Sequence, residues 1–348
     1  IYFNMKFLYT LICLSSLIAC QTQVPTKTVD ANQKNASDFT LSFGSCNNQE
    51  IPNELWQEIV KNNPDVWVWG GDVIYSDTYD MAFMKKNYAK QKADAAYQTF
   101  LKKVPVIGTW DDHDYGVNDG GIEYSKKNEV QKLFLDFMDA DSTDVRRTRE
   151  GVYYSKIYPV GTYSIKIIVL DTRYFRTGLT NDPSAKKRYL PNNYGEGSML
   201  GEAQWNWLKQ ELDSSKADFN IIESSIQVLS YEHGFETWGN MPHEVVKLEK
   251  TIADSKAKGV IILSGDRHIA EISETNVPDL AYPLIDITSS GLTHSYTSYS
   301  GEANKYRISD VVAKKNFGLI KFDFKNHKAL FELRGLNNKL YQTYTQQY

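Results

Sequence analysis

The sequence predicts a layered α/β fold whose loops gather at the carboxyl ends of the strands. Two observations lead to this prediction. Short apolar segments with strand character alternate along the chain with longer segments of helical periodicity. Several of the apolar segments also end at glycine and continue into a polar loop. The composition, with 41% hydrophobic and 24% charged residues, is that of a globular protein.

The first part of the expected domain contains three strands and two helical regions. Phe39–Phe43 alternates apolar and polar residues, which predicts a strand with one buried face. The next apolar segment carries large apolar residues on both faces, as a central strand does. The strands are expected at 39–43, 65–69 and 104–108, and the helices at 52–61 and 80–102.

The same alternation continues to the end of the chain. Strands are expected at 163–170, 218–224, 259–264, 283–289 and 317–333. Helices are expected at 125–138, 202–213 and 243–257. The stretch 174–200 has no such periodicity, and we expect it to be a loop that borders the functional site.

The N-terminal segment is typical of an export leader. Residues 1–4 are interpreted as an extension upstream of the true start, and residues 5–19 as a signal peptide too short to span a bilayer. The apolar run ends at Leu17-Ile18-Ala19-Cys20, which resembles the lipobox of bacterial lipoproteins, where the Cys is acylated. The polar stretch 20–38 is then a flexible tether, followed by a single domain over 39–348. The alternative is an ordinary signal peptide that happens to end near a cysteine.

This interpretation predicts an exported protein with lipid on Cys20. The lipid anchors it to a bacterial membrane, at the outer membrane or the periplasmic face, and the folded domain lies in the periplasm or at the cell surface. Cys46 is then the only thiol left in that domain, because Cys13 leaves with the leader, and it cannot form an intramolecular disulfide. An inert buried thiol is the alternative use.

Four of the expected strand ends are followed by carboxylate, histidine or cysteine side chains. The four junctions are Gly44-Ser45-Cys46, Gly70-Gly71-Asp72, Trp110-Asp111-Asp112-His113-Asp114 and Gly265-Asp266-Arg267-His268. Carboxylates that converge at one edge of a sheet repel one another unless cations lie among them. The sequence therefore predicts a metal site with more than one ion.

Taken in order, these motifs resemble the metallophosphoesterases, and within them the PhoD-like (alkaline phosphatase D) family. Gly71-Asp72-Val73-Ile74-Tyr75 matches the GDxxY pattern of the superfamily. The junctions after 108 and 264 stand where the superfamily usually has Gly-Asn-His-Glu and Gly-His-x-His. The resemblance spans about residues 39–335, and it implies a four-layer α/β/β/α sandwich with two mixed sheets.

The resemblance further implies a site with two or more metal ions. The implied ligands are Cys46, Asp72, Tyr75, Asp112, Asp266 and His268. In this scheme Cys46, Tyr75 and His268 bind a ferric ion, and Asp72 bridges it to a second metal. The remaining ligands of the second metal are carboxylates, whose oxygens favour Ca²⁺, whereas Zn²⁺ or Mn²⁺ serves in relatives with Asn and His there.

The implied reaction is in-line displacement at phosphorus by a metal-bound hydroxide. His113 is expected to contact the phosphate or protonate the leaving oxygen. Arg173 is expected to form a bidentate contact with the phosphate, and Arg267 is the alternative for that contact. Asn118-Asp119 is most simply a turn, with support of the second metal as its alternative role. The histidines at 233 and 294 are interpreted as surface residues.

The function that follows is hydrolysis of phosphate monoesters or diesters by a monomeric enzyme. One alternative is a phospholipase D-like phosphodiesterase that acts on membrane lipids beside the anchor. The remote alternative is a non-enzymatic surface lipoprotein that binds glycan or protein through its 23 tyrosines. The net charge of −4 argues against a specific nucleic-acid partner, but it does not argue against a phosphate substrate, because bound metals reverse the local charge.

Overall fold

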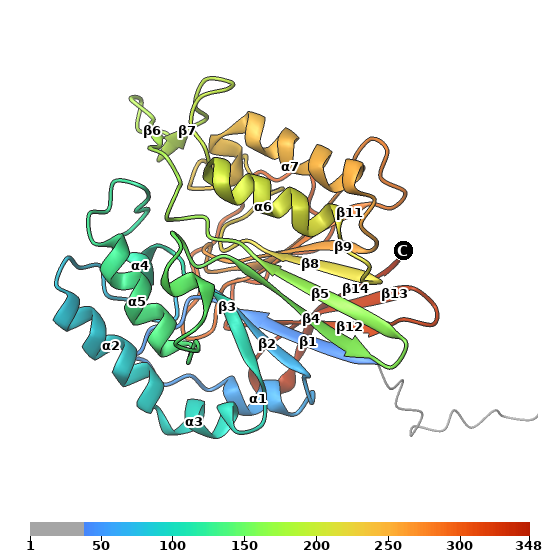
Figure 1. Cartoon of the computed structure of the whole chain (residues 1–348), viewed down its shortest axis with the longest axis horizontal. Helices are drawn as coiled ribbons and strands as arrows, with labels where there is room; N and C mark the ends of the chain where they lie inside the picture. Colours follow the sequence, from blue (N-terminus) through green and yellow to red (C-terminus); the bar gives the residue numbers. More distant parts are fainter. Residues whose placement is uncertain (1–37) are drawn as a thin grey trace, which may run out of the picture. The chain divides into compact units, whose positions relative to one another are not determined.

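The computed structural model describes residues 38–348 and confirms the four-layer α/β/β/α arrangement, in which two sheets pack face to face between helices (Figure 1). The first sheet has six strands, in the order β14 (Leu340–Gln347), β13 (Lys328–Arg334), β12 (Phe317–Asp323), β1 (Phe39–Gly44), β2 (Val66–Gly70) and β3 (Val106–Thr109). β1, β2 and β3 are parallel to one another, and β12 joins β1 in the antiparallel sense.

The second sheet also has six strands and is also mixed. Its order is β10 (Ala270–Thr275), β11 (Leu284–Ser289), β9 (Val260–Ser264), β8 (Phe219–Glu223), β5 (Tyr163–Val169) and β4 (Tyr154–Val160). The four inner strands are parallel, and the two edge strands are antiparallel to their neighbours. Each sheet therefore has a set of parallel strands whose carboxyl ends lie at one edge.

β2 shows why its sequence is apolar at every position. Val66 and Val68 belong to the core between the two sheets, whereas Trp67 and Trp69 belong to the core under the helices of the first sheet. Because successive side chains of a strand point to opposite faces, a strand covered on both sides must be apolar on both sides. Trp56 packs edge-on against Trp67, with ring centroids 5.4 Å apart.

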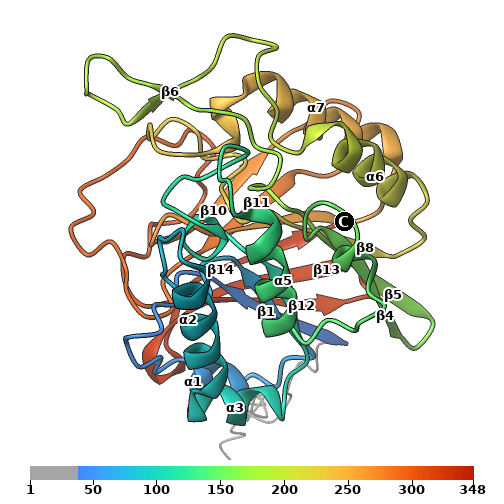
Figure 2. The same cartoon turned by 60° about the vertical axis from the view of Figure 1, so that its left-hand side comes forward.

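Helices cover the outer face of each sheet, as Figure 2 shows from a second direction. The helices over the first sheet are α1 (Trp56–Val60), α2 (Met81–Ala93), α3 (Ala95–Leu101) and α5 (Lys127–Phe137). The helices over the second sheet are α6 (Gly201–Asp213) and α7 (Pro242–Ser255). The region 80–102 divides at Asp94, which leaves the helical backbone conformation and accepts a hydrogen bond from the amide of Tyr97 to begin α3.

Several elements differ from the sequence prediction. The edge strands β4, β10 and β14 were not expected, because each contains several polar residues and few apolar ones to mark it as a strand. The stretch 317–333 forms two strands, β12 and β13, joined by a turn at His327 with φ 49°. The first helix is shorter than expected and begins only at Trp56. The loop 174–200 contains a small hairpin of β6 (Thr180–Asn181) and β7 (Tyr189–Leu190).

The predicted leader, the lipidated Cys20 and the tether up to residue 37 lie outside the described residues. Asp38, the first described residue, already pairs with the domain: its amide donates to Phe322 and its carboxylate accepts from the amide of Phe324. No helix within residues 38–348 combines the length and the apolar character that crossing a bilayer requires. The domain boundaries given above stay a prediction.

Candidate metal centre

The candidate site lies at the carboxyl ends of parallel strands from both sheets. Cys46 follows β1 and Asp72 follows β2, whereas Asp112 opens the short helix α4 (Asp112–Tyr115) just after β3. Asp266 and His268 follow β9 of the second sheet. The two sheets face each other, so these loops meet at one end of the sandwich.

The backbone is strained where the candidate ligands sit. Cys46, Asp72, Asp266 and His268 all have positive φ, between 48° and 68°. Residues other than glycine seldom adopt this conformation, and it concentrates at functional sites. Gly71, with φ 89°, brings the chain so close that a Cβ there would lie 2.3 Å from the Cβ of Asp111. The fold thus holds these side chains in positions that an unstrained loop would not give.

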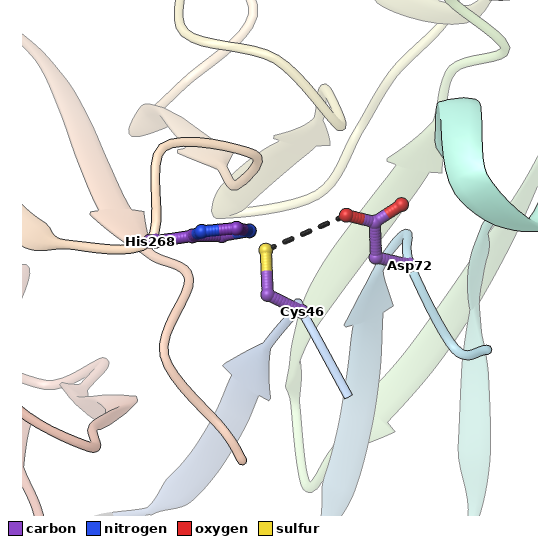
Figure 3. A group of neighbouring side chains, drawn as sticks. All are labelled: Cys46, Asp72 and His268. Atoms are coloured by element: carbon purple, nitrogen blue, oxygen red, sulfur yellow. Dashed lines mark hydrogen bonds between the residues drawn. The ribbon is translucent and has the colours of Figure 1, made fainter. Parts of the chain in front are cut away.

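One group of side chains gathers around Asp72. Figure 3 shows the thiol of Cys46, the carboxylate of Asp72 and the ring of His268 directed at one another. The Sγ of Cys46 lies 3.6 Å from Oδ2 of Asp72, and the hydroxyl of Tyr75 lies 3.1 Å from the same oxygen and 3.0 Å from Nε2 of His268. Thiol, phenol, carboxyl and imidazole therefore converge on one point, and this donor set fits a transition-metal ion.

A second group consists of carboxylates alone. Asp111, Asp112 and Asp266 have ligand atoms within 4.8 Å of one another, and Asp112 does the same with Asp119 and Glu236. Asp112 also joins Asp72 in a further group with His113, so the two assemblies are continuous. An all-oxygen donor set of this density fits hard cations such as Ca²⁺.

The site contains several buried acidic groups whose charged forms need nearby positive charge. Burial raises the pKa of Asp72 to about 8, and it raises the pKa of Asp111 and of Asp266 well above the usual range. Burial also raises the pKa of the Cys46 thiol and of the Tyr75 phenol, and the charge of Asp72 adds to both shifts. Cations among these groups would stabilise their charged forms, which is the ordinary reason for such a concentration of buried acids.

His113 lies beside the Asp72 group. Its ring stacks on Tyr75 with centroids 4.2 Å apart, and its Nδ1 lies 2.7 Å from Oδ2 of Asp77. Burial acts to lower the pKa of His113, but the charges of Asp72 and Asp112 raise it to about 11. An imidazolium held by a carboxylate at one nitrogen can present a proton from the other.

The side chain of Arg173 does not reach solvent. Its side chain is fully buried, with Nε 2.5 Å from Asp111 and Nη1 2.5 Å from Glu236. Burial acts to raise the pKa of Asp112, but Arg173 and His113 hold it down at about 2. Arg173 thus positions and charges the carboxylates, and the geometry gives no support to the phosphate contact predicted for it.

Three residues beyond the predicted ligands contribute to the site. Asn118-Asp119 forms the predicted turn, and Asp119 also fits the alternative role of supporting the second metal, because it lies in a group with Asp112 and its backbone amide donates to Oδ2 of Asp112 at 2.6 Å. Asp114 accepts hydrogen bonds from the amides of Asp72 and Val73 and so fixes the loop after β2. His294 was interpreted as a surface residue, yet its ring lies 4.4 Å from the ring of His268.

A pocket of about 210 Å³ opens onto these groups. It is lined by Asp112, His113, Asn118, Asp119, Arg188, Phe235, Glu236, Asp266, Arg267, His268 and Tyr296. Its lining includes carboxylates of the second group and, from the first group, His268. Arg188 lies in the loop 174–200, which was expected to border the site, whereas Glu236 lies in the long loop before α7 and had no role in the sequence prediction.

Known proteins resemble this chain along most of its length. The family model described as PhoD-like phosphatase matches residues 41–328. Alkaline phosphatase D of Bacillus subtilis (strain 168) is 22% identical over 336 residues, which cover 84% of this chain and 56% of that protein. The chain therefore spans little more than half the length of this curated relative.

Solved structures show the same fold at low identity. A structure of PhoD has a TM-score of 0.71 and 16% identity, covering 89% of this chain and 69% of that one. GAP50 of Plasmodium has a TM-score of 0.56 at 15% identity, covering 89% and 88%. A dimetal phosphatase from Danio rerio has a TM-score of 0.51 at 13% identity, covering 90% and 99%. With the family model matching most of its residues, the chain belongs to the PhoD-like phosphatases.

Proposed function

We propose that this protein hydrolyses phosphate esters, as an alkaline phosphatase, a phosphodiesterase or both, with more than one metal ion in the pocket. The observation that carries the proposal is the continuity of two donor groups through Asp72 and Asp112, together with a pocket that Asp112 and His268 line. Family membership supports it, since the relative from Bacillus subtilis is named alkaline phosphatase D. Bound metals would polarise the phosphoryl oxygens and lower the pKa of the attacking water.

The protein's own residues have separate tasks in this scheme. The carboxylates of Asp72 and Asp112 would hold the cations, and Arg173 keeps Asp111 and Glu236 in place beside them. His113 holds a proton at the pocket wall and delivers it to the leaving oxygen, while Asp77 fixes the ring orientation through Nδ1. The narrow pocket limits the number of waters that reach the reacting phosphorus.

We further propose ferric iron in the group formed by Cys46, Asp72, Tyr75 and His268, and Ca²⁺ among the carboxylates. Phenolate and carboxylate oxygens suit a hard ferric ion, and carboxylates alone suit Ca²⁺. Zn²⁺ or Mn²⁺ in the carboxylate group is the alternative. Metal analysis of the purified protein distinguishes these assignments.

Replacing Cys46 with Ser is expected to lower the iron content and to change any visible charge-transfer band. The hydroxyl of serine is a far poorer ligand than a thiolate, because it does not ionise in this range of pH. Elemental analysis and the absorption spectrum measure the effect, with Cys46→Ala as a second variant that also lacks sulfur. Unchanged iron and an unchanged spectrum in both variants would remove Cys46 from the site.

Replacing His113 with Ala is expected to reduce kcat by about 10²- to 10⁴-fold while the metal content stays unchanged, because a positioned general acid supplies about that factor. The control is His243→Ala, which removes a half-buried histidine at the start of α7, away from the pocket lining. A loss below about tenfold in His113→Ala would contradict the acid role.

The activity itself is tested with p-nitrophenyl phosphate and bis(p-nitrophenyl) phosphate above neutral pH. We expect hydrolysis that chelator abolishes and that added Ca²⁺ restores. Protein loaded with iron and Ca²⁺ that turns over neither ester would overturn the proposal. Release of choline from phosphatidylcholine, with no hydrolysis of these esters, would favour the phospholipase D-like alternative.

We also propose that the protein is exported and anchored by lipid on Cys20, after cleavage of residues 5–19. The support is the segment Leu17-Ile18-Ala19-Cys20 at the end of an apolar run. Metabolic labelling with a radioactive fatty acid tests it. Label is expected in the wild-type protein and absent from Cys20→Ala, and equal labelling or equal lack of labelling in both would contradict the anchor.

A further inference from the structure

Two arginines stand on the wall of the pocket, and neither belongs to the candidate metal groups. Arg188 directly precedes β7 in the loop 174–200, which Figures 1 and 2 show extending beyond the helices of the second sheet. Arg267 lies between Asp266 and His268 after β9. Both line the same pocket as the metal-binding carboxylates, although they come from loops far apart in the sequence.

Two contacts hold the Arg267 side chain in place, but they do not satisfy all of its N–H groups. Its guanidinium carbon lies 4.0 Å from the centre of the Phe235 ring, and its Nη2 lies 2.9 Å from Glu302. The side chain is only 9% exposed, and its Nε has no hydrogen-bond partner among the described residues. A buried N–H without a partner is costly. The Nε atom is itself closed to solvent, so a ligand in the pocket would meet Arg267 through the outer nitrogens of its guanidinium.

Arg188 forms an ion pair with Asp119, a carboxylate that also belongs to a candidate metal group. Its Nη2 lies 2.5 Å from Oδ2 of Asp119, and the same oxygen accepts a hydrogen bond from Tyr189 at 2.7 Å. Asp119 belongs to the carboxylate group with Asp112 and Glu236. A cation in that group would compete with Arg188 for Asp119, and the side chain of Arg188, which is 47% exposed, could then turn to an anion in the pocket.

We propose that Arg188 and Arg267 form a subsite for a second anionic group of the substrate, so that the protein prefers small phosphate esters with a further carboxylate or phosphate. This rests on the proposed phosphoesterase function, in which the metals hold the scissile phosphate. A neutral alcohol offers two guanidiniums only a single uncharged acceptor, whereas an anion receives forked, charge-assisted hydrogen bonds. The pocket of about 210 Å³ is smaller than a usual drug-sized site, which favours a short alcohol.

The activity test compares 3-phosphoglycerate with glycerol 3-phosphate, which differ in the charge of one terminal group. We expect kcat/KM to favour 3-phosphoglycerate by about tenfold or more, since one charge-assisted hydrogen bond contributes about that factor. Arg188→Ala and Arg267→Ala should each lower this ratio. Arg188→Lys should lower it in part, because it keeps the charge and loses the fork. The matched control is Lys186→Ala, which removes a charge from the same loop outside the pocket lining and should leave the ratio unchanged.

A binding test judges the subsite without turnover. The metal-loaded protein is titrated by calorimetry with 3-phosphonopropionate and with propylphosphonate, which are not hydrolysed. Tighter binding of 3-phosphonopropionate that depends on Arg188 supports the subsite even if both esters resist hydrolysis, in which case the proposed function alone has failed. Equal affinities for the two phosphonates, or a preference that survives both arginine variants, would overturn the proposal.

Discussion

Replacing Asp72 with Asn is expected to lower kcat/KM for phosphate esters by at least about 10³-fold and to deplete the bound metals. Asp72 joins Cys46 and His268 in one candidate group and Asp112 and His113 in another. An amide has no charge and one oxygen fewer, so the two proposed cations would be held more weakly at this shared position. A decrease in kcat/KM of this size corresponds to the loss of several kcal/mol of transition-state stabilisation by the metals, because each tenfold change equals about 1.4 kcal/mol.

The Asp72 variant separates metal binding from folding. Asparagine tolerates the φ of 48° at this position and has nearly the same shape as aspartate. The control is Asp213→Asn on the exposed end of α6, where the carboxylate pairs with Lys209 on the surface. Activity and metal content are measured for both variants. A fully active Asp72→Asn protein with its metals retained would remove Asp72 from the centre of the site.

Replacing Arg173 with Ala is expected to lower the free energy of unfolding by about 3 to 5 kcal/mol, the usual cost of removing one partner of a buried ion pair. Its guanidinium lies between Asp111 and Glu236, and all three side chains are at most 1% exposed. Without it, the carboxylate of Asp111 would stay buried without this partner, and Glu236 would keep only its ion pair with Arg176. Urea unfolding of the metal-loaded protein measures the change.

The control for Arg173 is a pair on the surface. Lys209→Ala breaks the contact with Asp213 on α6 and should change the free energy of unfolding by less than about 1 kcal/mol. Arg173→Lys should recover only part of the loss, because an ammonium cannot bridge two carboxylates in the way a guanidinium does. A change below about 1 kcal/mol in Arg173→Ala would mean that Asp111 and Glu236 do not depend on it.

The central strands and the four ligand-bearing loops could be predicted because they leave a strong local signal. β2 is apolar on both faces since it lies between two cores, and it ends at Gly70-Gly71-Asp72, where the chain must turn sharply. An abrupt change from apolar strand to carboxylate marks such a loop without knowledge of the rest of the fold. The order of these loops then gave the family and, through it, the two mixed sheets.

Edge strands and long-loop residues could not be predicted in the same way. β14 consists mainly of polar residues, and only pairing with β13 makes it a strand. Glu236 and Arg188 reach the pocket from loops without periodicity, so their positions depend on tertiary packing alone. The partners of Arg173 are 62 and 63 residues away in sequence, and no local pattern shows whether an arginine faces substrate or buried acids.

Elemental analysis of the purified protein, set beside its rate of ester hydrolysis, tests whether hydrolysis depends on bound metals. We expect more than one metal ion per chain, with iron among them, and we expect metal content and hydrolysis to fall together in Asp72→Asn but not in Asp213→Asn. A wild-type protein that hydrolyses phosphate esters at full rate with only trace metal would rule out a metal-dependent site.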